Sequence, residues 1–126
     1  MQNNLKFESE TYAILGVCFE VYNKLGHGFL EIVYKDAIEL ESDLRNIPLE
    51  REKKYSIKYK EIVLPHYFFA DFVIFNKIIL EIKANKNGIS EEVIAQTLNY
   101  LKVSECSIGL IVNFGVNKLE YKRLIY

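Results

Sequence analysis

The fold of this chain is decided by residues Tyr67–Ala84, YFFADFVIFNKIILEIKA. The stretch predicts two apolar strands joined by a tight turn, and runs as apolar as these are typical of strands that are covered on both faces. Within the two strands, only Asp71, Glu81 and Lys83 carry charge. A charge in such surroundings is costly unless it is paired or binds a ligand, so these three residues are the first candidates for function.

The spacing of the three charges decides whether they can act together. Glu81 and Lys83 are two residues apart in one strand and therefore point to the same face. A two-residue loop at Asn76–Lys77 would place Asp71 opposite Ile82 and on the other face. A three-residue loop, or a bulge in either strand, would instead place Asp71 opposite or diagonal to Glu81. We predict one of these last two arrangements.

The two carboxylates would then lie side by side in an apolar environment. They would repel each other, and one would have to take up a proton unless a cation lies between them. A ligand set of oxygens alone favours a hard divalent ion such as Mg²⁺ or Mn²⁺, which keeps several waters for phosphoryl chemistry. A salt bridge from Lys83 to one carboxylate is the structural alternative, but it leaves the second acid without a partner.

An acid on one strand followed by Glu-x-Lys on the next, here Asp71 and Glu81-Ile82-Lys83, resembles the PD-(D/E)xK nuclease superfamily. Ala70 stands where the superfamily's name has proline, a departure that leaves the acids and the lysine in place. The resemblance implies an α/β fold with a PD-(D/E)xK nuclease-like core, a mixed central sheet flanked by helices on both sides. It also implies metal-dependent hydrolysis of phosphodiester bonds.

A second motif covers Gly28–Tyr34, GFLEIVY, and is similar to the G-x-x-E-x-x-Y signature of the GxxExxY proteins, a branch of that superfamily. Each motif is weak alone, and it is their order along a chain of this length that makes the resemblance specific. The further landmarks are, in order, Asp71, Glu81, Lys83, Gln96, Tyr100, Asn113-Phe114-Gly115 and Arg123.

The resemblance implies a role for each residue of the central strands. Asp71 and Glu81 would bind Mg²⁺ or Mn²⁺ together with the backbone carbonyl of Ile82. Lys83 would either orient and deprotonate the attacking water or stabilise charge on the phosphate. All three charged residues would thus be catalytic.

Helical residues would complete the site. Glu31 would be a further catalytic and metal-binding acid, and Tyr34, Gln96 and Tyr100 would position the substrate. Spacing alone favours a structural interpretation, in which Glu31 is a first-turn acid favoured by the helix dipole and Tyr34 is a core residue, and it is the resemblance that favours the functional one. Gln96 and Tyr100 lie four residues apart and so share one face of a helix.

Composition bounds the class of protein. The chain has 126 residues, of which 50% are hydrophobic and 26% charged, so residues 1–126 are expected to form a single globular domain. The net charge is −1, so any surface that binds nucleic acid must be local. No apolar segment is long enough to suggest a leader or a membrane span, and we expect a soluble, cytoplasmic protein. Cys18 and Cys106 are expected to be buried reduced thiols.

Periodicity predicts the remaining elements. Apolar residues recur at helical spacing in the first third of the chain, and Ser90 precedes two glutamates as a helix N-cap would. A short apolar run after that helix predicts a buried strand parallel to a central one. We expect helices at about 10–25, 30–46 and from 91, a half-exposed strand at 50–64 turning near 60–61, the buried strand at 107–113, and a last strand or dimer contact at 119–126.

The segment 53–60 carries four lysines and two tyrosines. It forms either a strip that contacts phosphates and stacks bases or a solvated edge strand that the lysines protect. Together with the acid pair, the resemblance implies a metal-dependent nuclease that acts on nucleic acid, DNA more than RNA. The alternative is a non-catalytic binding or assembly module that retains the nuclease fold. A homodimer or another protein partner is also expected.

Overall fold

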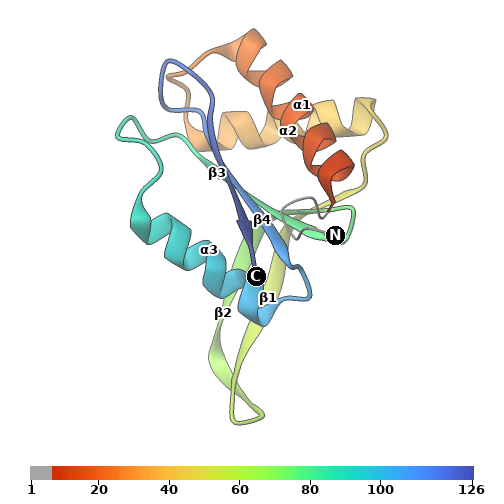
Figure 1. The fold of residues 1–126 in the computed structure, drawn as a ribbon, viewed down its shortest axis with the longest axis vertical. Helices are drawn as coiled ribbons and strands as arrows, with labels where there is room; N and C mark the ends of the chain where they lie inside the picture. Colours follow the sequence, from red (N-terminus) through yellow and green to blue (C-terminus); the bar gives the residue numbers. More distant parts are fainter. Residues whose placement is uncertain (1–6) are drawn as a thin grey trace.

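The structure, a computed structural model, describes residues 7–126, in which two helices are followed by three strands, a third helix and two further strands of the same sheet (Figure 1). The helices are α1 (Glu8–Leu25), α2 (Glu31–Leu44) and α3 (Glu91–Val103). The strands are β1 (Leu49–Tyr59), β2 (Ile62–Ile74), β3 (Ile78–Lys83), β4 (Ile108–Asn113) and β5 (Glu120–Ile125).

The five strands form one mixed sheet in the order β1-β2-β3-β4-β5. β3 and β4 are parallel and are connected through α3, as the sequence predicts, while the other neighbouring pairs are antiparallel. A helix is the usual way to connect parallel neighbours, because the chain must return to the same end of the sheet. The final segment adds β5 to the sheet edge beside β4.

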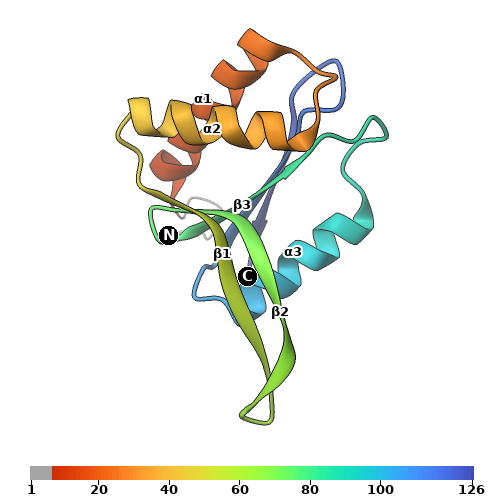
Figure 2. The same ribbon diagram turned by 180° about the vertical axis from the view of Figure 1, so that it is seen from behind.

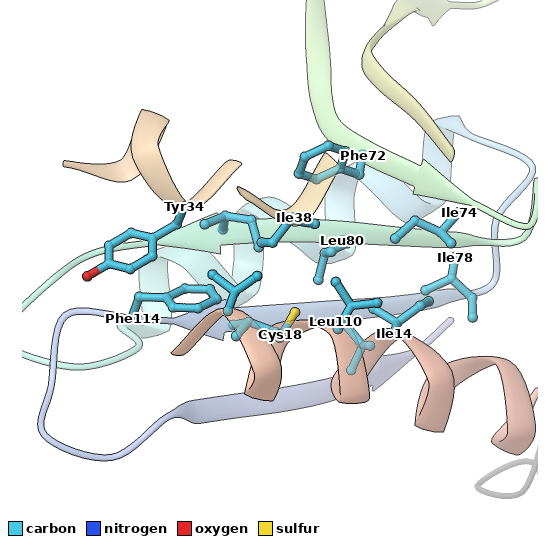
Figure 3. Close-up of a cluster of buried hydrophobic side chains, with 14 of the residues drawn as sticks. Ile14, Cys18, Tyr34, Ile38, Phe72, Ile74, Ile78, Leu80, Leu110 and Phe114 are labelled. Carbon is cyan, nitrogen blue, oxygen red and sulfur yellow. The ribbon is translucent and has the colours of Figure 1, made fainter. Parts of the chain in front are cut away.

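Helices cover both faces of this sheet, which confirms the predicted architecture (Figures 1 and 2). α1 and α2 pack on one face, where Figure 3 shows Tyr34 and Ile38 of α2 against Leu80 and Phe114. α3 packs on the other face, where Leu101 meets the buried side chain of Ile79. β3 and β4 are covered on both sides, which explains why their sequences are almost continuously apolar.

The helix ends lie within two residues of the predicted positions. Ser90 caps α3, because its Oγ accepts a hydrogen bond from Val93 N at 3.1 Å. Gly26 ends α1 with φ +68°, and its N–H donates to Tyr22 O at 2.7 Å. α2 begins after Leu30, whose backbone is extended.

The loop between β2 and β3 has three residues, Phe75–Lys77, because Ile74 pairs with Ile78 across it. Phe75 and Asn76 take left-handed backbone conformations with φ +57° and +58°. The predicted three-residue loop is therefore confirmed. Counting back along both strands from the loop places Asp71 opposite Glu81.

The loop between β1 and β2 is tighter. Tyr59 pairs with Ile62 across Lys60 and Glu61, whose φ values of +50° and +68° fit the type I′ turn that two-residue hairpins prefer. The register shifts between Ser56 and Lys58. The two strands run on past the rest of the molecule as a long hairpin (Figure 2).

Two further expectations concern bulk properties. Cys18 and Cys106 are both buried and free, and burial raises the pKa of the Cys18 thiol to about 12. Within residues 7–126, none of the helices is long and apolar enough to cross a membrane.

Candidate active site

The two predicted acids lie where β2 and β3 separate. Regular pairing of these strands ends at Phe72 and Leu80, one residue before Asp71 and Glu81. Beyond that point, Asp71 N donates to Glu81 Oε2 at 2.9 Å and Ile82 N donates to Asp71 Oδ2 at 2.8 Å. Each carboxylate thus takes a hydrogen bond that another strand would take in a regular ladder. The gap between the strands is filled by carboxylate oxygen.

β1 is also irregular beside this gap. Arg51 pairs with Phe72 and Lys53 with Ala70, but Glu52 between them has φ +56° and forms no pair. A left-handed conformation is uncommon for a residue other than glycine, and such conformations cluster at functional sites. The alternation of side chains along β2 is broken at this point. Ala70 packs on the α3 side, whereas Phe72 packs toward α1 and α2, although residues two apart in a regular strand share a face.

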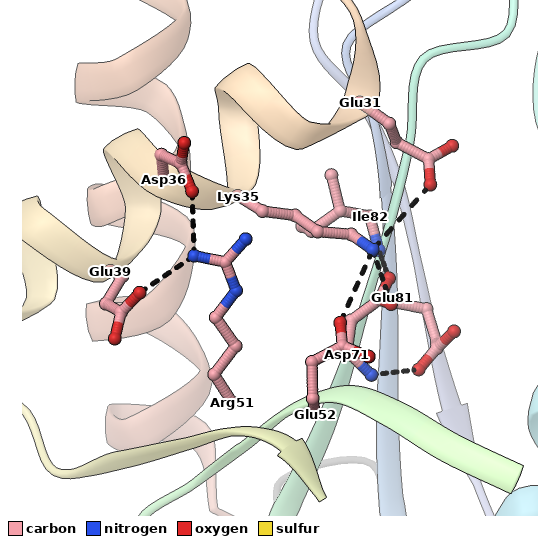
Figure 4. Close-up of polar contacts among 9 residues, drawn as sticks. All are labelled: Glu31, Lys35, Asp36, Glu39, Arg51, Glu52, Asp71, Glu81 and Ile82. Carbon is pink, nitrogen blue, oxygen red and sulfur yellow. Dashed lines mark hydrogen bonds and ion pairs between the residues drawn. The ribbon is translucent and has the colours of Figure 1, made fainter.

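Lys35 of α2 reaches into the site and contacts three carboxylates (Figure 4). Its Nζ lies 2.9 Å from Asp71 Oδ1, 3.7 Å from Glu52 Oε2 and 3.9 Å from Glu31 Oε1. Burial opposes the charge, but the hydrogen bond and charge of Asp71, with Glu52 and Glu31, raise the pKa of Lys35 above its ordinary value. This ammonium is the main positive charge on the α2 side of the acids.

Sequence reasoning missed both Lys35 and Glu52. Lys35 follows Glu31 by four residues, and this helical ion-pair spacing is a signal that could have pointed to it. Glu52 carries no comparable signal, because its position depends on an unusual backbone conformation in the middle of a strand. Arg51, the residue before it, fixes β1 to α2 through ion pairs of 2.8 Å with Asp36 and Glu39.

The Glu81 carboxyl is only 5% exposed, and its charge is poorly compensated. Burial raises its pKa most, and the neighbouring charge of Asp71 raises it further. The hydrogen bond from Asp71 N and the charges of Lys83 and Lys35 act in the opposite direction, and the pKa of Glu81 is about 8. The positive charge near Asp71 and Glu81 is therefore too small to compensate both carboxylates.

Lys83 and Glu31 lie near the acids without touching them. Lys83 is half-buried two residues beyond Glu81, and in the part of the chain that the structure describes it forms no ion pair. The alternative salt bridge from Lys83 to a carboxylate is therefore wrong, because Lys35 holds that position on Asp71. Glu31 reaches Asp71 only through Lys35.

The oxygens of Asp71, Glu81 and Ile82 form a possible donor set for a divalent ion. Across residues 7–126, no three acidic, histidine or cysteine side chains converge as a metal-binding group. Asp71 and Glu81 nevertheless supply two adjacent carboxylates, and Mg²⁺ is commonly bound through one or two carboxylates with waters and substrate phosphate. Ile82 N–H points toward β2, and a strand residue directs its carbonyl to the same side as its N–H. The chemistry of these oxygens fits a hard cation.

Tyr100 and Gln96 lie on the α3 side of the site. Burial raises the pKa of the Tyr100 hydroxyl, and the charges of Glu81 and Asp71 raise it further. Gln96 is exposed one turn earlier. With Ile57, Phe68, Asn99, Lys102 and Val103, these two side chains line a groove of about 370 Å³.

Tyr34 is fully buried, in contrast to the substrate contact expected for it. Its hydroxyl donates to Gly26 O at 2.6 Å and accepts from Phe29 N at 3.2 Å. Its ring stacks on Phe114 with centroids 4.4 Å apart. The geometry makes Tyr34 a brace for the loop that leads to Glu31, because no face of the side chain is open to a substrate.

The Asn113-Phe114-Gly115 landmark has a structural explanation. Asn113 Oδ1 accepts from Asn85 N at 2.8 Å and from Gly115 N at 3.1 Å, while its Nδ2 donates to Asn85 O at 2.8 Å. A Cβ on Gly115 would lie 2.4 Å from Asn85 N. The landmark therefore ties the chain leaving β3, just after Lys83, to the end of β4.

Comparisons with known proteins support the fold. A family model described as the PD-(D/E)XK nuclease superfamily matches residues 8–124. A solved structure, "Crystal structure of SSO0001", is similar with a TM-score of 0.58 and 18% sequence identity. The likeness covers 96% of this chain but 60% of that one, so this chain spans less than two thirds of that protein's length. The comparison with curated proteins returned no match.

Proposed function

Because the chain belongs to the PD-(D/E)XK nuclease superfamily, we propose that it is a metal-dependent nuclease that hydrolyses phosphodiester bonds of nucleic acid, DNA in preference to RNA. Within the superfamily we assign it to the GxxExxY branch on the motif Gly28–Tyr34. Nucleases of this superfamily generally use divalent metals, and we propose Mg²⁺ or Mn²⁺ here.

The observation that carries this proposal is the pair of buried carboxylates between β2 and β3. Asp71 and Glu81 are 9% and 5% exposed, and the raised pKa of Glu81 reflects too little positive charge around two acids. The ion pair with Lys35 accounts for Asp71, whereas the second buried acid, Glu81, adds desolvation cost and repulsion that a purely structural site does not need. An acid pair of this kind is favourable when a divalent cation binds.

Each residue of the site has a proposed task. Asp71, Glu81 and the carbonyl of Ile82 would hold the ion, which when bound polarises a phosphate and lowers the pKa of a water. Lys83 would orient and deprotonate that water or stabilise charge developing on the phosphate. Glu31 would act through Lys35, whose ammonium also contacts Asp71.

Residues on α3 and α2 would act around this centre. Gln96 and Tyr100 line the groove on the α3 side and would position the substrate. Tyr34 would support the site indirectly, by holding the loop before α2. It is a positioning residue, because its hydroxyl contacts backbone atoms alone within the described chain.

The test combines metal binding with cleavage. Mg²⁺ and Mn²⁺ are titrated by calorimetry into the wild type and into Asp71→Asn and Glu81→Gln, and each protein is then incubated with labelled linear, circular and single-stranded DNA and with RNA. Each substitution keeps the size of the side chain and removes a ligand charge. We expect wild-type cleavage that requires the metal, and a loss of roughly 100-fold or more in each variant, since removing a positioned charge typically costs this much.

Asp43→Asn is the matched control, because Asp43 is an exposed acid on α2 away from the site. Its metal binding and cleavage should equal those of the wild type. Cleavage that persists in both site variants would sink the proposal. So would wild-type protein that neither binds a divalent ion nor cleaves any of the four substrates.

One observation favours a second candidate, a non-catalytic binding or assembly module. Lys35 already lies 2.9 Å from Asp71, so the site contains an ion pair that holds α2 to the sheet without any metal. In that case Asp71→Asn would lower the stability of the fold while calorimetry detects no ion binding in the wild type. The nuclease proposal predicts instead that the wild type binds a divalent ion and that Asp71→Asn weakens or abolishes this binding.

A further inference from the structure

The β1–β2 hairpin reaches beyond the other strands and α3 in both views of the molecule (Figures 1 and 2). We call residues 53–69 the hairpin arm. The arm carries four lysines and one glutamate, a formal charge of +3, whereas the whole chain carries −1. The rest of the chain therefore carries a net negative charge, and the arm is a locally basic segment.

The two faces of the arm differ. One face packs on α3, where Phe68 stacks on Tyr100 with ring centroids 3.9 Å apart and on Tyr55 at 5.2 Å. Phe68 and Tyr55 therefore belong to the body of the protein. The other aromatic rings of the arm, those of Tyr59, Tyr67 and Phe69, do not take part in this packing.

The opposite face is aromatic, basic and exposed. Lys54 pairs with Phe69 and Ser56 with Tyr67 across the hairpin, so these side chains share a face. Tyr67 is 54% exposed and Phe69 is 46% exposed, with their rings edge to face at 5.5 Å. Lys54 Nζ lies 4.0 Å from the centre of the Tyr67 ring. We call these four residues the arm face.

The arm face leads to the acids. Phe69 precedes Asp71 by two residues in the same strand, about 7 Å along it. Further out, Lys60 lies against the ring of Tyr59 at 5.5 Å, and Lys58 is exposed near the tip. Positive charge and aromatic surface therefore extend from the tip of the arm to the edge of the candidate active site.

We propose that the arm face binds a single-stranded segment of nucleic acid and leads it toward Asp71 and Glu81. Phe69 and Tyr67 stack unpaired bases, and lysines 54, 58 and 60 contact phosphates. Ring faces of bases are accessible to such side chains in a single strand and are covered by neighbouring pairs in a duplex. The delivery to the acids rests on the proposed function, whereas the binding itself does not.

Charge favours nucleic acid over a second protein as the occupant. The exposed rings lie among lysines, and lysine is depleted in protein–protein interfaces, where aromatic residues, methionine and arginine are enriched. A polyanion instead gains from each lysine through the release of counterions. Because the rest of the chain carries a net negative charge, the lysines of the arm provide the local positive potential that attracts phosphate.

The test measures oligonucleotide binding in EDTA, where metal-dependent cleavage cannot occur. Fluorescence anisotropy gives the affinity for a labelled single strand and for the matching duplex over a series of salt concentrations. Phe69→Ala should weaken single-strand binding by about 5- to 100-fold, the effect of one stacked base, with little change for the duplex. The triple variant K54Q/K58Q/K60Q should make the salt dependence shallower by about 2 in log–log slope, because each phosphate contact on a single strand contributes about 0.7.

Two matched controls separate the arm from the rest of the surface. Tyr12→Ala removes a ring that is 80% exposed on α1, and K24Q/K86Q/K118Q removes the same charge from exposed positions elsewhere. Both should bind the single strand as the wild type does. Equal losses in arm and control variants, or no single-strand binding by the wild type, overturn the proposal. A wild-type dimer that Phe69→Ala converts to monomer with unchanged oligonucleotide affinity also overturns it, because the arm face would then join two copies of the chain.

The outcomes also distinguish this proposal from the proposed nuclease activity. Arm-dependent binding in EDTA without any metal-dependent cleavage contradicts the nuclease and supports the arm. Metal-dependent cleavage that is unchanged in Phe69→Ala and in the triple lysine variant supports the nuclease and contradicts the arm.

Discussion

At the scale of single residues, Lys35 is the side chain on which the electrostatics of the site depends most. Its ammonium is shared by Asp71, Glu52 and Glu31, so it occupies one oxygen of an acid that we propose as a metal ligand. Lys35 and a divalent ion would therefore compete for Asp71. The competition makes opposite predictions for metal affinity and for stability.

Lys35→Gln should tighten Mg²⁺ or Mn²⁺ binding several-fold, because the substitution frees Asp71 Oδ1 and leaves the site more negative. Without metal the same variant should be less stable by roughly 1 to 3 kcal/mol, since partly buried carboxylates lose their partner. Calorimetry and denaturant unfolding in EDTA measure the two effects. Lys24→Gln on α1 is the control, and metal affinity that falls in Lys35→Gln would show that Lys35 does not compete with the ion.

At the scale of elements, the site depends on how β3 and β4 end together. Asn113 at the end of β4 bonds both the N–H and the carbonyl of Asn85, and Nδ2 also donates to Glu120 Oε1 of β5 at 3.0 Å. The main chain just beyond Lys83 is held in this way. The Asn-Phe-Gly landmark thus contributes to the site by fixing the end of β3, and not through hydrogen bonds to the acids.

Asn113→Ala should lower the free energy of unfolding by about 3 kcal/mol or more, because it leaves the N–H groups of Asn85 and Gly115 without a partner and opens a small cavity. Asn117→Ala is an exposed control and should stay within about 0.5 kcal/mol of the wild type. Denaturant unfolding followed by circular dichroism measures both. A loss as small as that of the control would mean that water replaces the carboxamide.

At the scale of the whole molecule, one buried acid makes the stability of the fold depend on pH. The pKa of Glu81 is about 8 in the folded chain and 4.5 as its ordinary value. Between these values the folded protein holds a proton that the unfolded chain has lost, so stability falls as pH rises through this window. Below the lower value Glu81 is protonated in both states, and above the upper value it is ionised in both. Outside this window Glu81 therefore no longer makes the free energy of unfolding depend on pH.

In EDTA, the wild type should therefore lose roughly 1 to 4 kcal/mol of stability between pH 5 and pH 9 through this group. Glu81→Gln cannot ionise and should lack this loss, which makes it the more stable protein at pH 9. The unfolding midpoint in denaturant across the pH range is the measurement, with the exposed Glu92→Gln as control. Parallel pH profiles for wild type and Glu81→Gln would contradict the raised pKa.

The sequence by itself determined the elements and the neighbourhood of the two acids. Apolar runs, helical spacing and a cap at Ser90 are local signals, and a three-residue loop then brings Asp71 opposite Glu81 by counting along two strands. These features follow from interactions between residues close in the chain, which is why pattern reasoning reaches them.

Only the tertiary structure decided what surrounds the acids. Lys35 contacts Asp71 because α2 packs on the sheet beside β1 and β3, and Glu52 joins them because one strand residue takes φ +56°. Tyr34 is buried against Phe114 for a similar reason, since the packing of α2 on the sheet decides which of its faces is closed. Such contacts join segments far apart in sequence, and their geometry depends on how whole elements pack, which no local pattern records.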